Sequence, residues 1–215
     1  MSQQPAGEGT APPEVIYIIR HGEKPVDSAP GKHGSPGKHP PAAAFGVDVR
    51  GSQNEHGLVP RGWQRSGALT VLLDPLRVPT QAGLHTPANL LSPSYGDPVK
   101  TAGHRTYQTI QGLADRLGLM IRTPFEVGHE SRLAASVLSD YSGVVLICWE
   151  HGHIPALAAA LPAAPGAAIP GTWPDDRFDM IWAFTRLPGP PPARYAFTQV
   201  PQRLLPGDAE TIIPV

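Results

Sequence analysis

Two continuous apolar runs constrain the fold of this chain more than any other feature. Residues 15–19 read Val-Ile-Tyr-Ile-Ile, and residues 144–149 read Val-Val-Leu-Ile-Cys-Trp. A strand with one solvated face alternates apolar and polar residues, whereas a strand covered on both faces is apolar throughout. The two runs therefore predict strands that are buried on both faces of a sheet.

Helical periodicity appears between and after these runs. Apolar residues recur at intervals of three and four, as on the buried face of a helix. The predicted helices span residues 60–74, 103–117, 130–138 and 154–161. Further short strands are predicted at residues 88–91 and 178–184. Because strands and helices alternate, we expect an α/β fold, a three-layer sandwich with a mostly parallel central sheet flanked by helices.

A chain of 215 residues is compatible with one domain. Residues 1–13 are predicted to form a flexible tail, followed by a single domain over residues 14–215. Residues 25–57 are rich in Pro, Gly and His and repeat Gly-Lys-His at 31–33 and 37–39. They show no regular period, so we expect a long loop insertion, part of which covers the binding cleft and restricts the size of the substrate.

Composition excludes several classes of partner. The 17 Lys and Arg residues balance 18 Asp and Glu residues, so general binding to nucleic acid or to a membrane surface is not expected. The first thirteen residues lack the pattern of a secretory signal, and no apolar run approaches the roughly 20 residues of a transmembrane helix. We expect a cytoplasmic protein in which the single cysteine, Cys148, is a core residue.

A histidine follows each of the two apolar runs after one intervening residue. Arg20-His21-Gly22 ends the first run, and Glu150-His151 ends the second. Ligands of open α/β sheets collect at the carboxyl ends of strands, so both imidazoles are expected to face one cleft. Arg105 lies in the first turn of the helix predicted at 103–117, where free N–H groups favour an anion. Two arginines and two histidines around one point predict a phosphate site.

The chemistry of phosphoryl transfer suits these residue types. The transition state spreads negative charge over three oxygens, which the planar guanidinium groups of Arg20 and Arg105 can bind. A neutral imidazole can attack phosphorus near neutral pH, and we assign this role to His21. His151 is expected to donate a hydrogen bond to a nonbridging oxygen.

Four segments together resemble a known family. They read Ile-Arg-His-Gly-Glu at 19–23, Leu-Val-Pro-Arg-Gly-Trp-Gln-Arg-Ser-Gly-Ala-Leu at 58–69, Arg-Thr-Tyr-Gln-Thr at 105–109 and Ile-Cys-Trp-Glu-His at 147–151. In this order they are similar to the histidine phosphatase superfamily, which has the phosphoglycerate mutase-like fold. The resemblance implies a phosphohistidine on His21, with Arg20, Arg105 and His151 around the transferred group.

The family also uses a carboxylic acid to protonate the leaving oxygen, and four glutamates are candidates for that role. They are Glu23, Glu126, Glu130 and Glu150, of which Glu130 and Glu150 are ranked highest. The expected catalytic set is therefore His21, Arg20, Arg105, His151, Glu130 and Glu150. Arg20, His21, Arg105 and His151 are expected to bind phosphate, without a metal or another cofactor.

Hydrolysis of a phosphomonoester is the expected activity, because the additional substrate-binding segments of the mutases are missing. The substrate is either a small phosphorylated molecule or a phosphoprotein, since the matched residues all bind the phosphoryl group. A phospho-ligand or phosphoprotein binding module with little turnover is the alternative. Nothing in the sequence indicates an oligomeric state.

Overall fold

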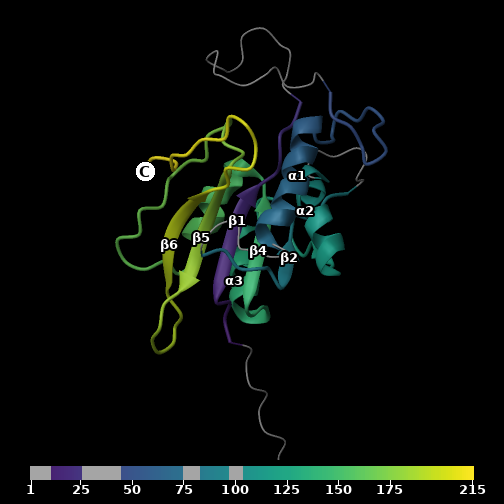
Figure 1. Cartoon of the computed structure of the whole chain (residues 1–215). Helices are drawn as coiled ribbons and strands as arrows, with labels where there is room; N and C mark the ends of the chain where they lie inside the picture. Colours follow the sequence, from purple (N-terminus) through teal and green to yellow (C-terminus); the bar gives the residue numbers. More distant parts are fainter. Residues whose placement is uncertain (1–10, 26–44, 75–82, 97–103) are drawn as a thin grey trace, which may run out of the picture.

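The computed structural model describes residues 11–25, 45–74, 83–96 and 104–215, which form a mixed α/β fold (Figure 1). Within these residues one sheet contains six strands in the order β3-β2-β4-β1-β5-β6. The strands are β1 (Val15–Arg20), β2 (Asn89–Leu91), β3 (Ile121–Arg122), β4 (Val144–Trp149), β5 (Met180–Arg186) and β6 (Tyr195–Pro201). The helices are α1 (Pro60–Leu73), α2 (His104–Leu117), α3 (Glu130–Asp140) and α4 (Ile154–Ala159), the last preceded by the 3-10 turn η1 (His151–His153).

The two apolar runs are the adjacent central strands β1 and β4. They pair in parallel, with Ile18 opposite Ile147 and Arg20 opposite Trp149. Successive side chains of a strand point to opposite faces. Ile18 accordingly belongs to the core beneath α3 and α4, whereas Ile19 belongs to the core beneath α1 and α2. The predicted burial of these strands on both faces is confirmed.

The sheet predicted to be mostly parallel is only partly parallel, because it is a mixed sheet. Strands β3, β2, β4 and β1 are parallel, whereas β5 runs antiparallel to β1 and β6 runs antiparallel to β5. After α4 the chain reaches the amino end of β1, where Ala163 bridges to Tyr195. Residues 164–179 then return along the molecule, so β5 begins at the carboxyl end of β1 and runs backward.

The other predicted elements are present with small shifts of their ends. The four helices and the strands at 88–91 and 178–184 correspond to α1 to α4, β2 and β5. Strands β3 and β6 were not predicted. Of the predicted loop, residues 45–57 contain only isolated bridges, from Val47 to Gln53 and to Leu58, and residues 26–44 lie outside the described ranges. The predicted cover over the cleft, including both Gly-Lys-His repeats, therefore falls on residues that are not described.

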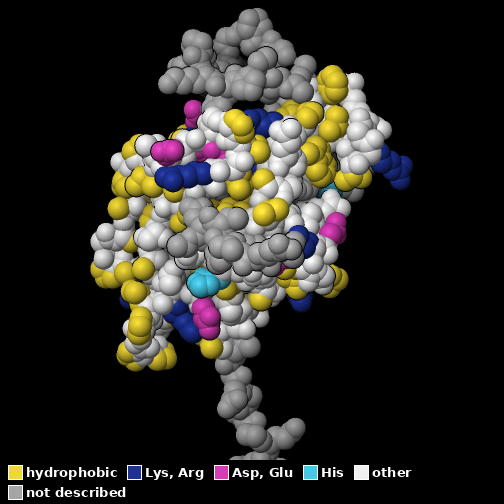
Figure 2. All heavy atoms as spheres, in the orientation of Figure 1, with side chains coloured by type: hydrophobic (Ala, Val, Ile, Leu, Met, Phe, Trp, Pro, Cys, Tyr) yellow, Lys and Arg dark blue, Asp and Glu magenta, His cyan; other side chains and the backbone are white. Residues whose placement is uncertain are grey.

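Most of the predicted tail also lies outside the described residues, although the carbonyl of Pro13 accepts a hydrogen bond from the buried hydroxyl of Tyr195. Cys148 is fully buried in the core, as predicted. None of the helices in the described part of the chain has the length and apolar character needed to cross a membrane. On the face drawn in Figure 2, basic and acidic side chains are interspersed rather than gathered by sign.

Candidate active site

The pairing of β1 with β4 brings the two predicted histidines together. Arg20 is the last residue of β1 and lies opposite Trp149, so His21 and His151 both emerge at the same edge of the sheet. The centroids of the two imidazole rings lie 6.0 Å apart, with the ring planes at 86°. The structure thus places both imidazoles beside one point at the carboxyl end of the central strands.

Arg20 is a buried guanidinium that is only partly paired. Its Nη1 donates to the carbonyl oxygens of Pro174 at 3.1 Å, Asp175 at 2.8 Å and Arg177 at 3.3 Å, and its Cζ lies 3.9 Å from the centroid of the Phe178 ring. Arg20 is 1% exposed, yet its Nε and Nη2 have no hydrogen-bond partner. Burial lowers the pKa of Arg20 to about 10, so the group stays charged at neutral pH. Two donors of this charged group are therefore buried without a partner.

A contact with the backbone fixes the tautomer of His21. Its Nδ1 lies 2.7 Å from the carbonyl oxygen of Gly22. A carbonyl oxygen only accepts hydrogen bonds, so Nδ1 carries the proton and Nε2 keeps its lone pair in the neutral ring. Burial, followed by the charge of Arg20, lowers the pKa of His21 well below its ordinary value. The imidazole is therefore neutral at physiological pH.

A short chain of hydrogen bonds joins the loop after β1 to helix α2. The Gly22 N–H donates to Oγ1 of Thr109 at 2.8 Å, and that hydroxyl donates to the carbonyl of Arg105 at 2.7 Å. Thr109 is fully buried. A Cβ on Gly62 of α1 would lie 2.5 Å from the carbonyl oxygen of Glu23, so glycine allows α1 to pack this closely. Both α1 and α2 thus position the backbone that follows His21.

Arg105 is braced by the segment that precedes α1. Its Nε donates to the carbonyl of Gly57 at 3.2 Å and its Nη2 donates to the carbonyl of Glu55 at 2.7 Å. Its charge also contributes to the lowered pKa of His21, after burial and Arg20. The charge of Arg105 therefore acts on His21, while its Nε and Nη2 bind backbone carbonyls.

Each ring nitrogen of His151 faces a carboxylate. Nε2 lies 2.7 Å from Oδ1 of Asp175 in a hydrogen bond. Nδ1 lies 2.7 Å from Oε1 of Glu150, an ion-pair distance without the alignment of a hydrogen bond. Although burial opposes ionisation of Glu150, its interactions with His151, with His153 and with the Gly152 N–H together outweigh burial and lower the pKa of that carboxyl.

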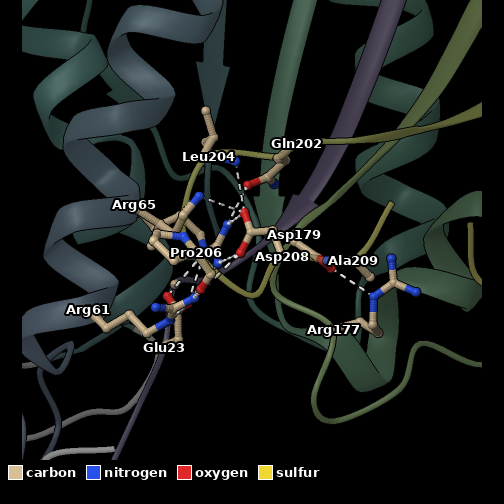
Figure 3. Close-up of polar contacts among 12 residues, drawn as sticks. Glu23, Arg61, Arg65, Arg177, Asp179, Gln202, Leu204, Pro206, Asp208 and Ala209 are labelled. Carbon is tan, nitrogen blue, oxygen red and sulfur yellow. Dashed lines mark hydrogen bonds and ion pairs between the residues drawn. The ribbon is translucent and has the colours of Figure 1, made fainter. Parts of the chain in front are cut away.

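Glu23, which directly follows His21-Gly22, is bound by arginines of α1 (Figure 3). Its Oε1 accepts from Nη2 of Arg65 at 2.7 Å and from Nε of Arg61 at 3.1 Å. Arg65 also pairs with Asp208 at 2.7 Å and bonds Gln202 at 3.1 Å. Burial opposes the charge of Arg65, but the two carboxylates outweigh burial and raise its pKa. This cluster ties the loop after His21 to α1 and to the C-terminal segment.

Glu130 opens α3 and accepts several hydrogen bonds. Its Oε1 receives the Gly128 N–H at 2.8 Å and the indole N–H of Trp149 at 3.0 Å, and it pairs with Nδ1 of His153 at 3.0 Å. Burial opposes ionisation of Glu130, but these donors outweigh burial and lower the pKa of the carboxyl. Glu126 is exposed on the loop that precedes α3. Of the four candidate glutamates, Glu150 is the one in contact with His151.

Three residues of the site were missed by sequence reasoning. Thr109 stood within the segment that resembles the family, but its buried hydroxyl gave no separate signal. Asp175 and Phe178 belong to an irregular stretch between α4 and β5, without periodicity to place it. Only the return of residues 164–179 to the carboxyl end of β1 brings this stretch against Arg20.

Across the described residues, no three His, Cys, Asp or Glu side chains gather in a group that could hold a metal ion. His33 and His39 of the Gly-Lys-His repeats lie outside those ranges. No family model, curated protein or solved structure matches the chain.

Proposed function

We propose that this protein is a phosphomonoester hydrolase that forms a phosphohistidine on His21. One observation carries the proposal: a buried, neutral imidazole with a free Nε2 lies beside a buried guanidinium with two unpartnered donors. Burying a charged group without partners is costly, so such a group is usually compensated by a ligand. A phosphoryl group carries the charge and the oxygens that suit Nε and Nη2 of Arg20.

The reaction proceeds in two displacements. In the first, Nε2 of His21 attacks phosphorus, the bond to the ester oxygen breaks, and the alcohol leaves with a proton from a carboxyl group. In the second, water attacks the phosphohistidine and releases inorganic phosphate, while the carboxylate takes a proton from the water. Arg20, Arg105 and His151 stabilise the negative charge of both transition states. Among the four glutamates, Glu150 is proposed for this role because it contacts His151, and its lowered pKa means that it must take up a proton before it can act as the donor.

The fold is compatible with this function. Helices on both faces of the sheet, and histidines at the carboxyl ends of β1 and β4, suit the three-layer phosphoglycerate mutase-like sandwich. We include membership of the histidine phosphatase superfamily in the proposal. A small phosphorylated molecule or a phosphoprotein is the proposed substrate.

Hydrolysis of p-nitrophenyl phosphate tests the proposal directly. We expect the wild-type protein to release p-nitrophenol and His21→Ala to lose this release. His129→Ala is a matched control, because His129 is exposed before α3 and its side chain does not cap the helix. Equal, negligible release from the wild type and from His21→Ala would overturn the enzymatic function.

The contacts of the glutamates favour a second candidate, a phosphate-binding module with little turnover. Glu23 and Glu130 are held as hydrogen-bond acceptors by Arg65 and Trp149, and neither contact leaves a proton to donate. Alkyl phosphates separate the two functions, since an alkoxide needs a proton to leave whereas p-nitrophenolate does not. Binding of an alkyl phosphate without hydrolysis, together with negligible p-nitrophenol release, would support the binding module.

A further inference from the structure

Asp175 combines a fixed backbone with an exposed side chain at the site. Its carbonyl oxygen accepts from Nη1 of Arg20 at 2.8 Å, within the group of carbonyls that holds this guanidinium. Its side chain is 74% exposed, and Oδ1 lies 2.7 Å from Nε2 of His151. The carboxylate is thus held at the rim of the site by one hydrogen bond and is free to rotate once that bond breaks.

The carboxylate is an anion that lies among the positive groups of the site. The hydrogen bond from His151 lowers the pKa of Asp175, and the charges of Arg20 and Lys24 act in the same direction. An ionised carboxylate presents two oxygens with negative charge, as does one edge of a phosphoryl group. Asp175 therefore offers to His151 the same kind of acceptor that a phosphate ester would offer.

The hydrogen bond between Asp175 and His151 occupies the ring nitrogen that a ligand would use. Nδ1 of His151 faces Glu150, so Nε2 is the ring nitrogen that remains for a ligand, and in the free protein Asp175 occupies it. Nε and Nη2 of Arg20 are not occupied. A phosphoryl group that binds Arg20 and His151 together must therefore displace the Asp175 side chain from His151.

We propose that the Asp175 carboxylate is an internal competitor of phosphate that sets the affinity of the site. It occupies Nε2 of His151 in the free protein, yields this donor to the phosphoryl group of the substrate, and returns to it as inorganic phosphate leaves. The ligand class is a phosphoryl group with at least two anionic oxygens, because the ligand must reach Arg20 and His151 together. This inference rests on the proposed function, since it assigns Nε2 of His151 to the phosphoryl group.

Binding of inorganic phosphate to Asp175→Asn and Asp175→Ala tests the competition. Asp176→Asn is the matched control, because it removes the same charge from the neighbouring exposed residue. The hydrogen bond of His151 is made to Asp175, so this control leaves it in place. Phosphate is titrated calorimetrically into each protein at pH 7 and constant ionic strength. An exposed charge pair is worth up to about 1 kcal/mol, so we expect both Asp175 variants to bind phosphate about two- to fivefold more tightly than wild type. Asp176→Asn should show less than half of that change.

Phosphate affinity in the Asp175 variants that is equal to or weaker than in Asp176→Asn would overturn the competition, as would a lack of phosphate binding in every protein. The thermal midpoint of each variant shows that the site was tested in the folded protein. The titration does not depend on turnover, whereas p-nitrophenyl phosphate hydrolysis by the wild type does. Tighter binding without hydrolysis would therefore retain the role of Asp175 and reject the hydrolase, and hydrolysis without tighter binding would do the opposite.

Discussion

The hydroxyl of Thr109 offers the sharpest test of how the fold positions His21. Thr109 is fully buried, and its Oγ1 is the acceptor for the Gly22 N–H at 2.8 Å. Gly22 in turn supplies the carbonyl that holds Nδ1 of His21. Thr109→Val keeps the shape of the side chain and removes the hydroxyl, which accepts from the Gly22 N–H and donates to the carbonyl of Arg105. It therefore leaves the Gly22 N–H buried without a partner.

The expected loss follows mainly from that N–H, because the carbonyl of Arg105 lies inside α2, where the helix backbone supplies a donor. A buried donor without an acceptor costs about 1–3 kcal/mol, so the free energy of unfolding of Thr109→Val should fall by this amount. Without this hydrogen bond, α2 no longer holds the loop that follows β1, and we expect His21 to shift with that loop. The kcat for p-nitrophenyl phosphate should then fall about tenfold or more. Thr109→Ser keeps the hydroxyl and loses one methyl group, which costs roughly 0.8 kcal/mol if fully buried.

Urea unfolding and steady-state kinetics at pH 7 measure both effects. Nitrogen-15 chemical shifts of the His21 ring report whether the proton stays on Nδ1, which a change in stability alone would not alter. In Thr109→Val we expect a mixture of tautomers, and in Thr109→Ser the wild-type tautomer. If Thr109→Val matches Thr109→Ser in stability, kcat and ring shifts, Thr109 does not position His21.

Three further predictions concern buried polar groups of the site. Arg20→Lys replaces a planar fork by one ammonium, so p-nitrophenyl phosphate turnover should be lost and the free energy of unfolding should fall by about 1–3 kcal/mol; unchanged turnover would contradict the role of the fork. Glu130→Ala should lower the free energy of unfolding by about 1–3 kcal/mol because the Trp149 indole N–H loses its acceptor, whereas Glu130→Gln keeps an oxygen there; urea unfolding should separate the two variants. Because the pKa of His21 is low in the folded state, the unfolded state binds one more proton below about pH 6.5. The free energy of unfolding should therefore decrease as the pH is lowered, by up to about 1.4 kcal/mol per pH unit. His21→Gln should reduce the slope of stability against pH in urea unfolding measured between pH 7 and pH 5. An identical slope in both proteins would show that His21 is not buried as a neutral ring.

The parts of the fold that were predictable depend on local pattern. The apolar runs of β1 and β4 and the periodicity of α1 and α2 reflect burial that each segment shows by itself. The direction of β5 could not be predicted in this way, because a strand has the same composition whether it runs parallel or antiparallel. It is determined by residues 164–179, which return to the carboxyl end of β1 without a regular period. Strand β3 has two residues, too few to show alternation.

The same distinction separates the two halves of the site. Arg20, His21 and His151 could be placed from the sequence, because residues at the end of a buried, parallel central strand lie at the carboxyl edge of the sheet. The carbonyls around Arg20 and the carboxylate of Asp175 come from a segment whose path depends on tertiary packing. The contacts of Glu23 show a related effect, since its partners Arg65 and Asp208 are far away along the chain and meet only in the folded structure.

Trapping of the phosphoenzyme tests the central assignment most directly. Protein mixed with radiolabelled p-nitrophenyl phosphate is quenched in denaturant at alkaline pH, where phosphohistidine survives, and the labelled peptide is identified by mass spectrometry. We predict label on His21 that is released by acid, absent from His21→Ala and retained in His129→Ala. Turnover by the wild type with label on another residue, or unchanged label in His21→Ala, would contradict the assignment of His21 as the nucleophile.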